Sequence, residues 1–185
     1  MAGLIPVRPM AGPYQPSLLR ILHGITALLV PLAWLSGLVV YSRHDGRWGR
    51  LPLNPGGDWI DIHGTIGVLL WPVALLFALY AISLGRRRLG RPANASALLA
   101  LALAVGSGKL MQEDWLRDRA LHHSVYTLHL CAWLAIGGSV LWHVAAGLGR
   151  GGLPLVASML RLSSRRGDRP RDWPRQIRVH FSRAG

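Results

Sequence analysis

Four histidines lie in the apolar segments of this chain, at a spacing that suits the binding of cofactors inside a membrane. His129 and His143 are fourteen residues apart within one apolar segment, and His23 and His63 each lie near the start of another. Fourteen residues of α-helix advance about 21 Å and rotate to within about 40° of four full turns, so both rings leave one helix face near opposite edges of a bilayer. One helix with this spacing can hold two stacked cofactors.

The composition favours a membrane protein. The 185 residues are 51% hydrophobic and only 16% charged, and long stretches carry no charge, which is rare in a soluble domain of this size. The net charge of +13 could suggest a nucleic-acid partner, but the arginines lie outside the apolar segments. Membrane topology explains them better, and we expect no nucleic acid to bind.

The apolar segments predict an all-α fold of four transmembrane helices. Residues 1–16 contain no apolar core of signal-peptide type, so we expect the first span to be an uncleaved anchor. Residues 17–149 are expected to form the helical domain, and residues 150–185 a basic tail. The predicted spans are about 17–42, 59–84, 93–111 and 121–148.

The arginines predict the orientation of these spans. The face that carries both termini holds fifteen arginines against Asp168 and Asp172, whereas the opposite face balances six cations with six acids. By the positive-inside rule, both termini lie in the cytoplasm. The expected location is a bacterial inner membrane or another energy-transducing membrane.

Topology then determines how the histidines pair. His23 should meet His143 on the cytoplasmic side, and His63 should meet His129 on the opposite side. A haem iron with two axial imidazoles requires one ligand above and one below the macrocycle, each held by a rigid helix. The sequence therefore predicts two haems b inside a four-helix bundle, with these four histidines as iron ligands.

Other interpretations of the histidines stay open. A histidine in a membrane span often serves as a hydrogen-bonding group between helices. Proton relays also use intramembrane ionisable residues, but they normally include acids, and only Asp61 lies near a span histidine. Zinc prefers three or four ligands, whereas each level offers two. Structural histidines, a relay, or transition-metal transport without haem are the alternatives.

Residues that share a helix face with the histidines, or lie one turn away, are also expected to contact haem. Gly37 follows His23 by fourteen residues, so its missing side chain would let a porphyrin lie against the backbone; ordinary helix packing is the competing explanation. Gly67 and Ala74 share the face of His63 in the same way. Arg20, one turn before His23, could pair with haem propionates or extend to the membrane interface.

Basic residues near the predicted level of His63 and His129 suggest an anion site. His122 shares the face of His129 and is a reserve ligand candidate, although its depth favours the interface. Cations here could attract superoxide, but six acids on the same face oppose this. The cluster consists of Lys109, Arg117, Arg119, His122 and His123.

The order and spacing of these motifs resemble the bacterial cytochrome b561 family, and more distantly the cytochrome b subunits of formate dehydrogenase and nickel–iron hydrogenase. The match comprises His23 with residues 32–39 (Leu-Ala-Trp-Leu-Ser-Gly-Leu-Val), 63–68 (His-Gly-Thr-Ile-Gly-Val), 107–111 (Ser-Gly-Lys-Leu-Met), His129 to Trp133, and 143–146 (His-Val-Ala-Ala). The resemblance implies a four-helix di-haem cytochrome with no ligand on the third span. The basic tail and the loop 45–50 lie outside the family pattern.

Transmembrane electron transfer is the expected function. The resemblance implies exchange with the quinone pool, and with superoxide, oxygen or a redox protein docked on either face; a quinone-linked oxidoreductase activity would fit. The alternative is a haem-bearing anchor that relays electrons within a larger complex. In the tail, residues 153–162 are expected at the membrane interface, and the arginines beyond them could bind anionic lipid head groups or a partner, or remain solvated.

Overall fold

Helices account for all the regular structure in the described part of the chain. The computed structural model describes residues 15–52, 55–113, 119–161 and 163–182, apart from the side chains of residues 119–122. The elements in chain order are α1 (Ser17–His44), α2 (Trp59–Ile82), α3 (Arg86–Leu89), α4 (Pro92–Met111), α5 (Arg119–Leu160), the 3-10 turn η2 (Pro170–Asp172) and α6 (Trp173–Ser182). The helices α1, α2, α4 and α5 are long and apolar enough to cross a membrane, which confirms the predicted multi-pass topology.

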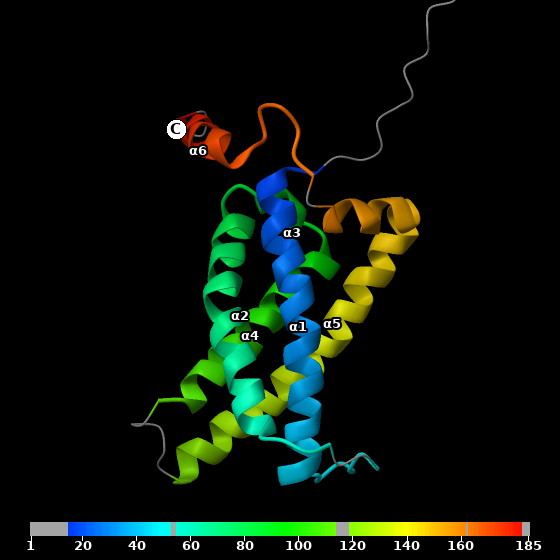
Figure 1. Ribbon diagram of the computed structural model, residues 1–185, viewed down its shortest axis with the longest axis vertical. Helices are drawn as coiled ribbons and strands as arrows, with labels where there is room; N and C mark the ends of the chain where they lie inside the picture. Colours follow the sequence, from blue (N-terminus) through cyan, green and yellow to red (C-terminus); the bar gives the residue numbers. More distant parts are fainter. Residues whose placement is uncertain (1–14, 53–54, 114–118, 162, 183–185) are drawn as a thin grey trace, which may run out of the picture.

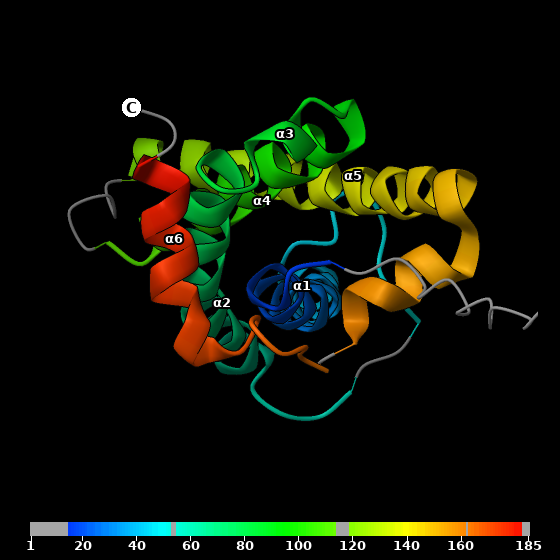
Figure 2. The ribbon, with the colours of Figure 1, turned by 90° about the horizontal axis from the view of Figure 1, so that it is seen from above.

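The four long helices form an up-and-down bundle (Figures 1 and 2). The closest packing is between α1 and α2 and between α4 and α5, while contacts of α2 with α4 and of α1 with α5 join the two pairs. We call the end with Ser17, α3 and α6 the tail end. The opposite end, where the chain turns after His44 and after Met111, is the loop end.

The helix ends follow local chemistry close to the predicted bounds. Asp58 caps α2, since its carboxylate accepts a hydrogen bond from the backbone N–H of Asp61 at 3.0 Å. Pro92 lies in the first turn of α4, where a proline N–H would have no helical partner. The first three spans end or begin within two residues of the predictions, and the arginine-rich loop between α2 and α4 forms the short helix α3.

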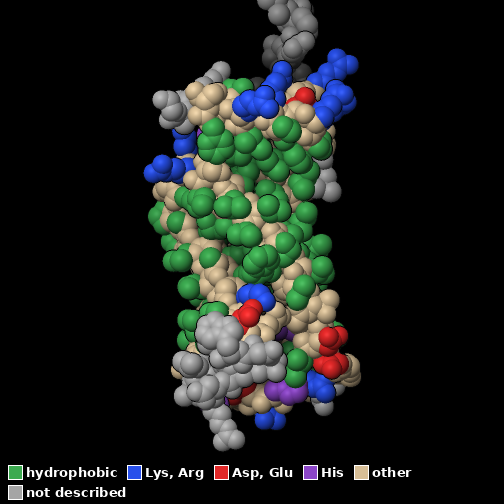
Figure 3. All heavy atoms as spheres, turned by 90° about the vertical axis from the view of Figure 1, so that its left-hand side faces the viewer, with side chains coloured by type: hydrophobic (Ala, Val, Ile, Leu, Met, Phe, Trp, Pro, Cys, Tyr) green, Lys and Arg blue, Asp and Glu red, His purple; other side chains and the backbone are tan. Residues whose placement is uncertain are grey.

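Few of the described large apolar side chains are buried, and many are exposed. A small buried cluster fills the middle of the bundle, whereas Leu141 is 74% exposed. Figure 3 shows a broad hydrophobic belt between two ends where the charged side chains gather. Such a belt suits hydrocarbon rather than water. The buried cluster consists of Leu70, Ala74, Ala100, Leu101 and Ile136.

The fourth span extends beyond its predicted end at residue 148 and then bends. Gly152 has φ 60° and ψ −163°, a conformation that favours glycine, and the helix changes direction there. Residues 153–160 then run across the tail end, as Figure 1 shows. Whether this segment lies at a membrane interface stays a prediction.

The tail folds back onto the start of α1. The backbone N–H of Ser17 donates to the carboxylate of Asp168 at 2.8 Å, and the Trp173 indole N–H donates to the Ser17 hydroxyl at 3.1 Å. Arg20 donates to the carbonyl of Arg161 at 2.6 Å and to that of Ser163. We call this set of contacts the tail latch; it joins the first and last helices that the structure describes.

Candidate cofactor site

The structure brings together the two histidine pairs that topology predicts. His23 of α1 faces His143 of α5 near the tail end, with ring centres 6.1 Å apart and ring planes at 41°. His63 of α2 faces His129 of α5 near the loop end, again with ring centres 6.1 Å apart, and with planes at 61°. We call them the tail-end pair and the loop-end pair.

This spacing matches two imidazoles that share one metal ion. A metal–imidazole bond is about 2 Å long and the ring centre lies roughly 1 Å behind the nitrogen, so two opposite imidazoles have centres about 6 Å apart. Edge-to-face ring packing covers the same range, as His23 and Phe77 show at 6.1 Å, so the distance permits a shared ion and the case for one rests on the repetition of the pair at two levels. Within the described residues, no group of three or more His, Cys, Asp or Glu could hold a metal ion. Each pair thus offers two nitrogen donors, the number that a haem iron takes from protein.

A large cavity surrounds the tail-end pair. Its volume of about 450 Å³ lies within the roughly 300–1,000 Å³ usual for organic ligands. The Nδ1 atoms of His23 and His143 and the Oδ1 atom of Asn94 are buried with no hydrogen-bond partner among the described residues. Phe77 meets the His23 ring edge to face, with centres 6.1 Å apart. This cavity has room for much of a macrocycle.

Arginines line this cavity, but Arg20 is not among them. Arg20 is only 3% exposed, and its guanidinium is engaged in the tail latch described above. The cavity-lining guanidinium groups, which could face the carboxylates of a ligand, are those of Arg88, Arg91 and Arg150. Sequence reasoning assigned this role to Arg20 because it is close to His23 along α1.

Hydroxyl groups hold the loop-end pair. The Ser36 hydroxyl lies 3.0 Å from Nδ1 of His63, and the Ser107 hydroxyl lies 3.0 Å from Nδ1 of His129. Both serines are 3% exposed. Sequence reasoning missed these two partners, although the dipeptide Ser-Gly at 36–37 and again at 107–108 was a signal for them.

The glycine of each Ser-Gly dipeptide makes room for a histidine ring. A Cβ atom on Gly37 would lie 3.1 Å from Cε1 of His63, and one on Gly108 would lie 3.2 Å from Cε1 of His129. The sequence interpretation placed a porphyrin edge beside Gly37, whereas the structure places an imidazole there. A Cβ atom on Gly67 would meet nothing within 4 Å, and Ala74 belongs to the buried central cluster.

The loop-end pair lies beside a much smaller cavity. The space between its helices measures about 50 Å³. Trp34 and Trp133 stack beside it, with ring centres 4.8 Å apart and planes at 14°. Each indole N–H donates to the other residue's carbonyl, at 3.1 and 3.0 Å. The donor set and ring spacing fit an iron at this level, but the enclosed space is smaller than a macrocycle.

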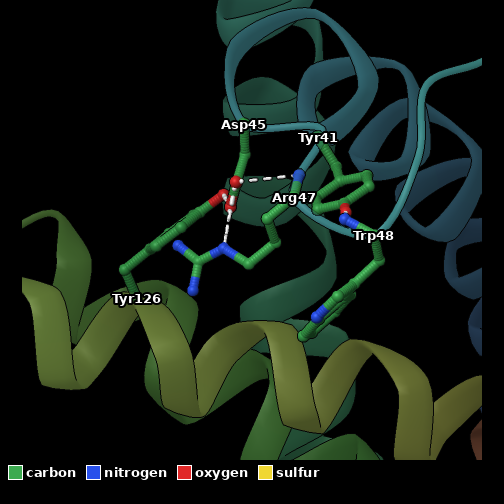
Figure 4. A network of polar contacts seen from close by, with 5 residues as sticks. All are labelled: Tyr41, Asp45, Arg47, Trp48 and Tyr126. Atoms are coloured by element: carbon green, nitrogen blue, oxygen red, sulfur yellow. Dashed lines mark hydrogen bonds and ion pairs between the residues drawn. The ribbon is translucent and has the colours of Figure 1, made fainter.

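A polar and aromatic network closes the loop end (Figure 4). Asp45 accepts from Arg47 at 2.8 Å and from the Tyr126 hydroxyl at 2.8 Å, which ties the end of α1 to α5. Hydrogen bonding from Arg47 holds the pKa of the Asp45 carboxyl below its usual value. Tyr41 stacks on both Trp48 and Trp133, at 5.7 and 6.1 Å between ring centres. The loop 45–50, which has no role in the family pattern, therefore covers the Trp34 and Trp133 stack.

The proposed anion cluster is only partly visible. Lys109 forms an ion pair with Glu113 at 2.7 Å, which offsets its charge, and His123 is exposed. Arg117 and the side chains of Arg119 and His122 lie outside the described residues, so these candidates stay predictions.

Comparisons of this chain with protein-family models, with curated proteins and with solved structures found no match. The resemblance to the cytochrome b561 family consequently rests on the sequence motifs quoted above. The structure itself shows a four-span membrane bundle with two histidine pairs at two levels.

Proposed function

We propose that this protein transfers electrons across a membrane through two bis-histidine haems b. The observation that carries the proposal is the repeated pair: two histidines on different helices, at two levels of the bundle, with the same 6.1 Å between ring centres. Nδ1 of His23 is buried with no hydrogen-bond partner among the described residues, whereas a histidine that only joins helices would use its ring nitrogens for such bonds. The cavity of about 450 Å³ gives independent support at the tail end.

The chain's own residues would do three things for such a cofactor. His23 and His143 would supply axial nitrogens at the tail end, and His63 and His129 would supply them at the loop end. When bound, a haem supplies an iron that exchanges one electron at a time, at a potential set by ligation, burial and hydrogen bonding. The apolar lining keeps water away, and Arg88, Arg91 and Arg150 place positive charge at the tail-end cavity.

We further propose that one electron partner is the membrane quinone pool, because quinones reside in the bilayer that the bundle spans. The other partner is a donor or acceptor at the membrane surface, such as superoxide or a docked redox protein. The arginine excess at the tail end supports a cytoplasmic position for both termini in a bacterial inner membrane or another energy-transducing membrane.

A reduced-minus-oxidised visible spectrum, with haem quantified per chain, tests the proposal. We expect two low-spin haems b in the wild type and one in each of His63→Ala and His143→Ala. The matched control is His180→Ala, which alters an exposed histidine on α6. A colourless wild type, purified with ample haem supply, would overturn the proposal. Retention of both haems in His63→Ala would overturn it at the loop end alone.

A relay subunit of a larger redox complex is the second candidate. The tail favours it, because α6 carries exposed Val179 and Phe181 beside arginines and packs mainly against η2. Quinol turnover by the purified chain with a soluble acceptor would support an independent oxidoreductase. A chain that is reduced by dithionite but inert with quinol would support the relay subunit.

A further inference from the structure

Two serines at the loop end contact the histidines that we propose as ligands, Ser36 at His63 and Ser107 at His129. We infer that Ser36 and Ser107 are positioning residues, which hold His63 and His129 with the proton on Nδ1 and leave both Nε2 lone pairs available to one metal ion. The part of this inference that concerns a metal rests on the proposed function. The part that concerns the proton does not.

The direction of each hydrogen bond follows from the serine's other partner. The Ser36 hydroxyl lies 3.1 Å from the carbonyl of Ala33, and the Ser107 hydroxyl lies 2.6 Å from that of Leu103. A carbonyl can only accept, so we infer that each hydroxyl gives its single proton to its own helix; the distances favour this most at Ser107, where the carbonyl lies at 2.6 Å and Nδ1 at 3.0 Å. With the proton placed there, the hydroxyl oxygen accepts and the histidine Nδ1 donates.

An Nδ1–H tautomer is the form that binds metal through Nε2. The other nitrogen of the neutral ring then carries an unprotonated lone pair. For His63 and His129, the hydrogen bonds among the described residues reach the ring through Nδ1, so nothing in this part of the chain competes for the Nε2 lone pair.

Glycine completes the arrangement on each side. Because a Cβ atom added at Gly37 or Gly108 would come within 3.1 or 3.2 Å of a ring carbon, each imidazole lies directly against the neighbouring helix. Contacts this close restrict rotation of the ring about the serine hydrogen bond. The Ser-Gly dipeptide of α1 thus contacts His63, and the Ser-Gly dipeptide of α4 contacts His129 in the same way.

The tail-end pair lacks this arrangement. No described side chain hydrogen-bonds to Nδ1 of His23 or of His143, although the carbonyl of Ala93 lies near the His143 ring. Donation of the Nδ1 proton makes an imidazole a stronger electron donor to a metal, which favours the oxidised ion. We therefore expect the serines to lower the reduction potential of the metal at the loop end.

The experiment combines two readouts on Ser36→Ala, Ser107→Ala and the double variant. Side-chain nitrogen NMR of histidine-labelled protein, prepared without cofactor, reports the tautomer. We expect one Nδ1–H form for the loop-end pair in the wild type and a mixture in the variants. In haem-loaded protein, a redox titration should show one component moving to higher potential while the other stays unchanged.

Ser182→Ala is the matched control, because this hydroxyl on α6 also bonds to a carbonyl of its own helix, that of Val179 at 3.2 Å, and lines neither cavity. The carbonyls of Ala33 and Ala104 lie near the same two rings and could accept the Nδ1 proton instead. Unchanged tautomers together with unchanged potentials in the double variant would overturn the inference. A colourless wild type would overturn the proposed function, and the NMR readout would still decide whether the serines position the rings.

Discussion

The tail-end and loop-end pairs share one ring spacing but differ in nearly everything around them. Both have ring centres 6.1 Å apart. The tail-end pair borders a cavity of about 450 Å³ and lacks Nδ1 partners among the described residues, whereas the loop-end pair borders about 50 Å³ and has a serine for each ring. Helix packing therefore sets the distance between the two histidine rings of a pair, while the neighbouring side chains set the space and polarity around them.

The two ends are also closed by different means. At the loop end, aromatic stacking between Trp34 and Trp133 fills the interior between α1 and α5. At the tail end, the chain's own tail covers the bundle through Arg20, Ser17 and Asp168. Side chains of the long helices close the loop end, whereas the segment that follows those helices closes the tail end.

The largest expected effect comes from removing the loop-end stack. Trp34→Ala deletes a half-buried aromatic ring and the hydrogen bond that its indole donates to the Trp133 carbonyl, and should lower the free energy of unfolding by about 2–4 kcal/mol. Unfolding in mixed micelles by increasing SDS measures this. Because a larger loop-end cavity leaves more room for a cofactor, we expect the haem content to be unchanged. A loss of haem at the loop end would show instead that the Trp34 ring, which lines this cavity, contacts the cofactor.

A smaller effect is expected from opening the tail latch. Arg20→Ala removes the charged group that donates to the carbonyls of Arg161 and Ser163. It should lower the free energy of unfolding by about 2–3 kcal/mol, because hydrogen bonds to buried charged groups are strong. We expect faster proteolysis of residues 163–182 with both haems retained. If residues 163–182 keep their resistance to proteolysis while the tail-end haem is lost, the propionate role that the sequence predicted for Arg20 would be restored.

Crowding one loop-end ring tests the glycine contact. Gly108→Ala should push the His129 ring by a few tenths of an ångström and weaken haem retention at the loop end by roughly tenfold, a cost of about 1–2 kcal/mol. Gly106→Ala on the same helix is the matched control, since an added Cβ atom meets nothing within 4 Å there. Equal haem loss in both variants would contradict the contact. Haem content after dilution into apomyoglobin as a haem acceptor provides the measurement.

The smallest effect concerns pH at the loop end. Because Arg47 lowers the pKa of Asp45, the stabilisation from this carboxylate is present above its ordinary pKa of about 4 and is lost as pH falls through the lowered value. Limited proteolysis of the loop 45–52 should therefore accelerate in acid. Asp45→Asn should remove most of this pH dependence and leave the tail end unaffected. An unchanged profile would show that another group controls the loop.

Periodic features of the sequence predicted the fold and the histidine pairs well. Hydropathy located α1, α2 and α4 within two residues, and helical rise with alternating topology was enough to match His23 with His143 and His63 with His129. Both results depend on spacing along regular helices. Whether the pairs bind haem stays a prediction.

Contacts between distant segments were beyond such reasoning. The partners of Arg20 are more than 140 residues away, so neighbouring residues on α1 gave no sign of them. The imidazole beside Gly37 comes from α2, and its position depends on how closely two helices approach. The Ser-Gly dipeptide occurs twice in the sequence, but its contact with a histidine could be predicted only by knowing which helix face meets which ring.

The tail latch has a consequence for the order in which the molecule is completed during synthesis. The serines that hold the loop-end rings and the lining of the loop-end cavity all precede residue 140, so that pair can form once α5 has crossed the bilayer. The wall of the tail-end cavity includes Leu155, Val156 and Met159, and the latch adds Asp168 and Trp173. A ribosome must therefore translate the chain past Trp173 before the tail-end compartment closes, so this compartment stays accessible from its side after the loop-end pair has formed.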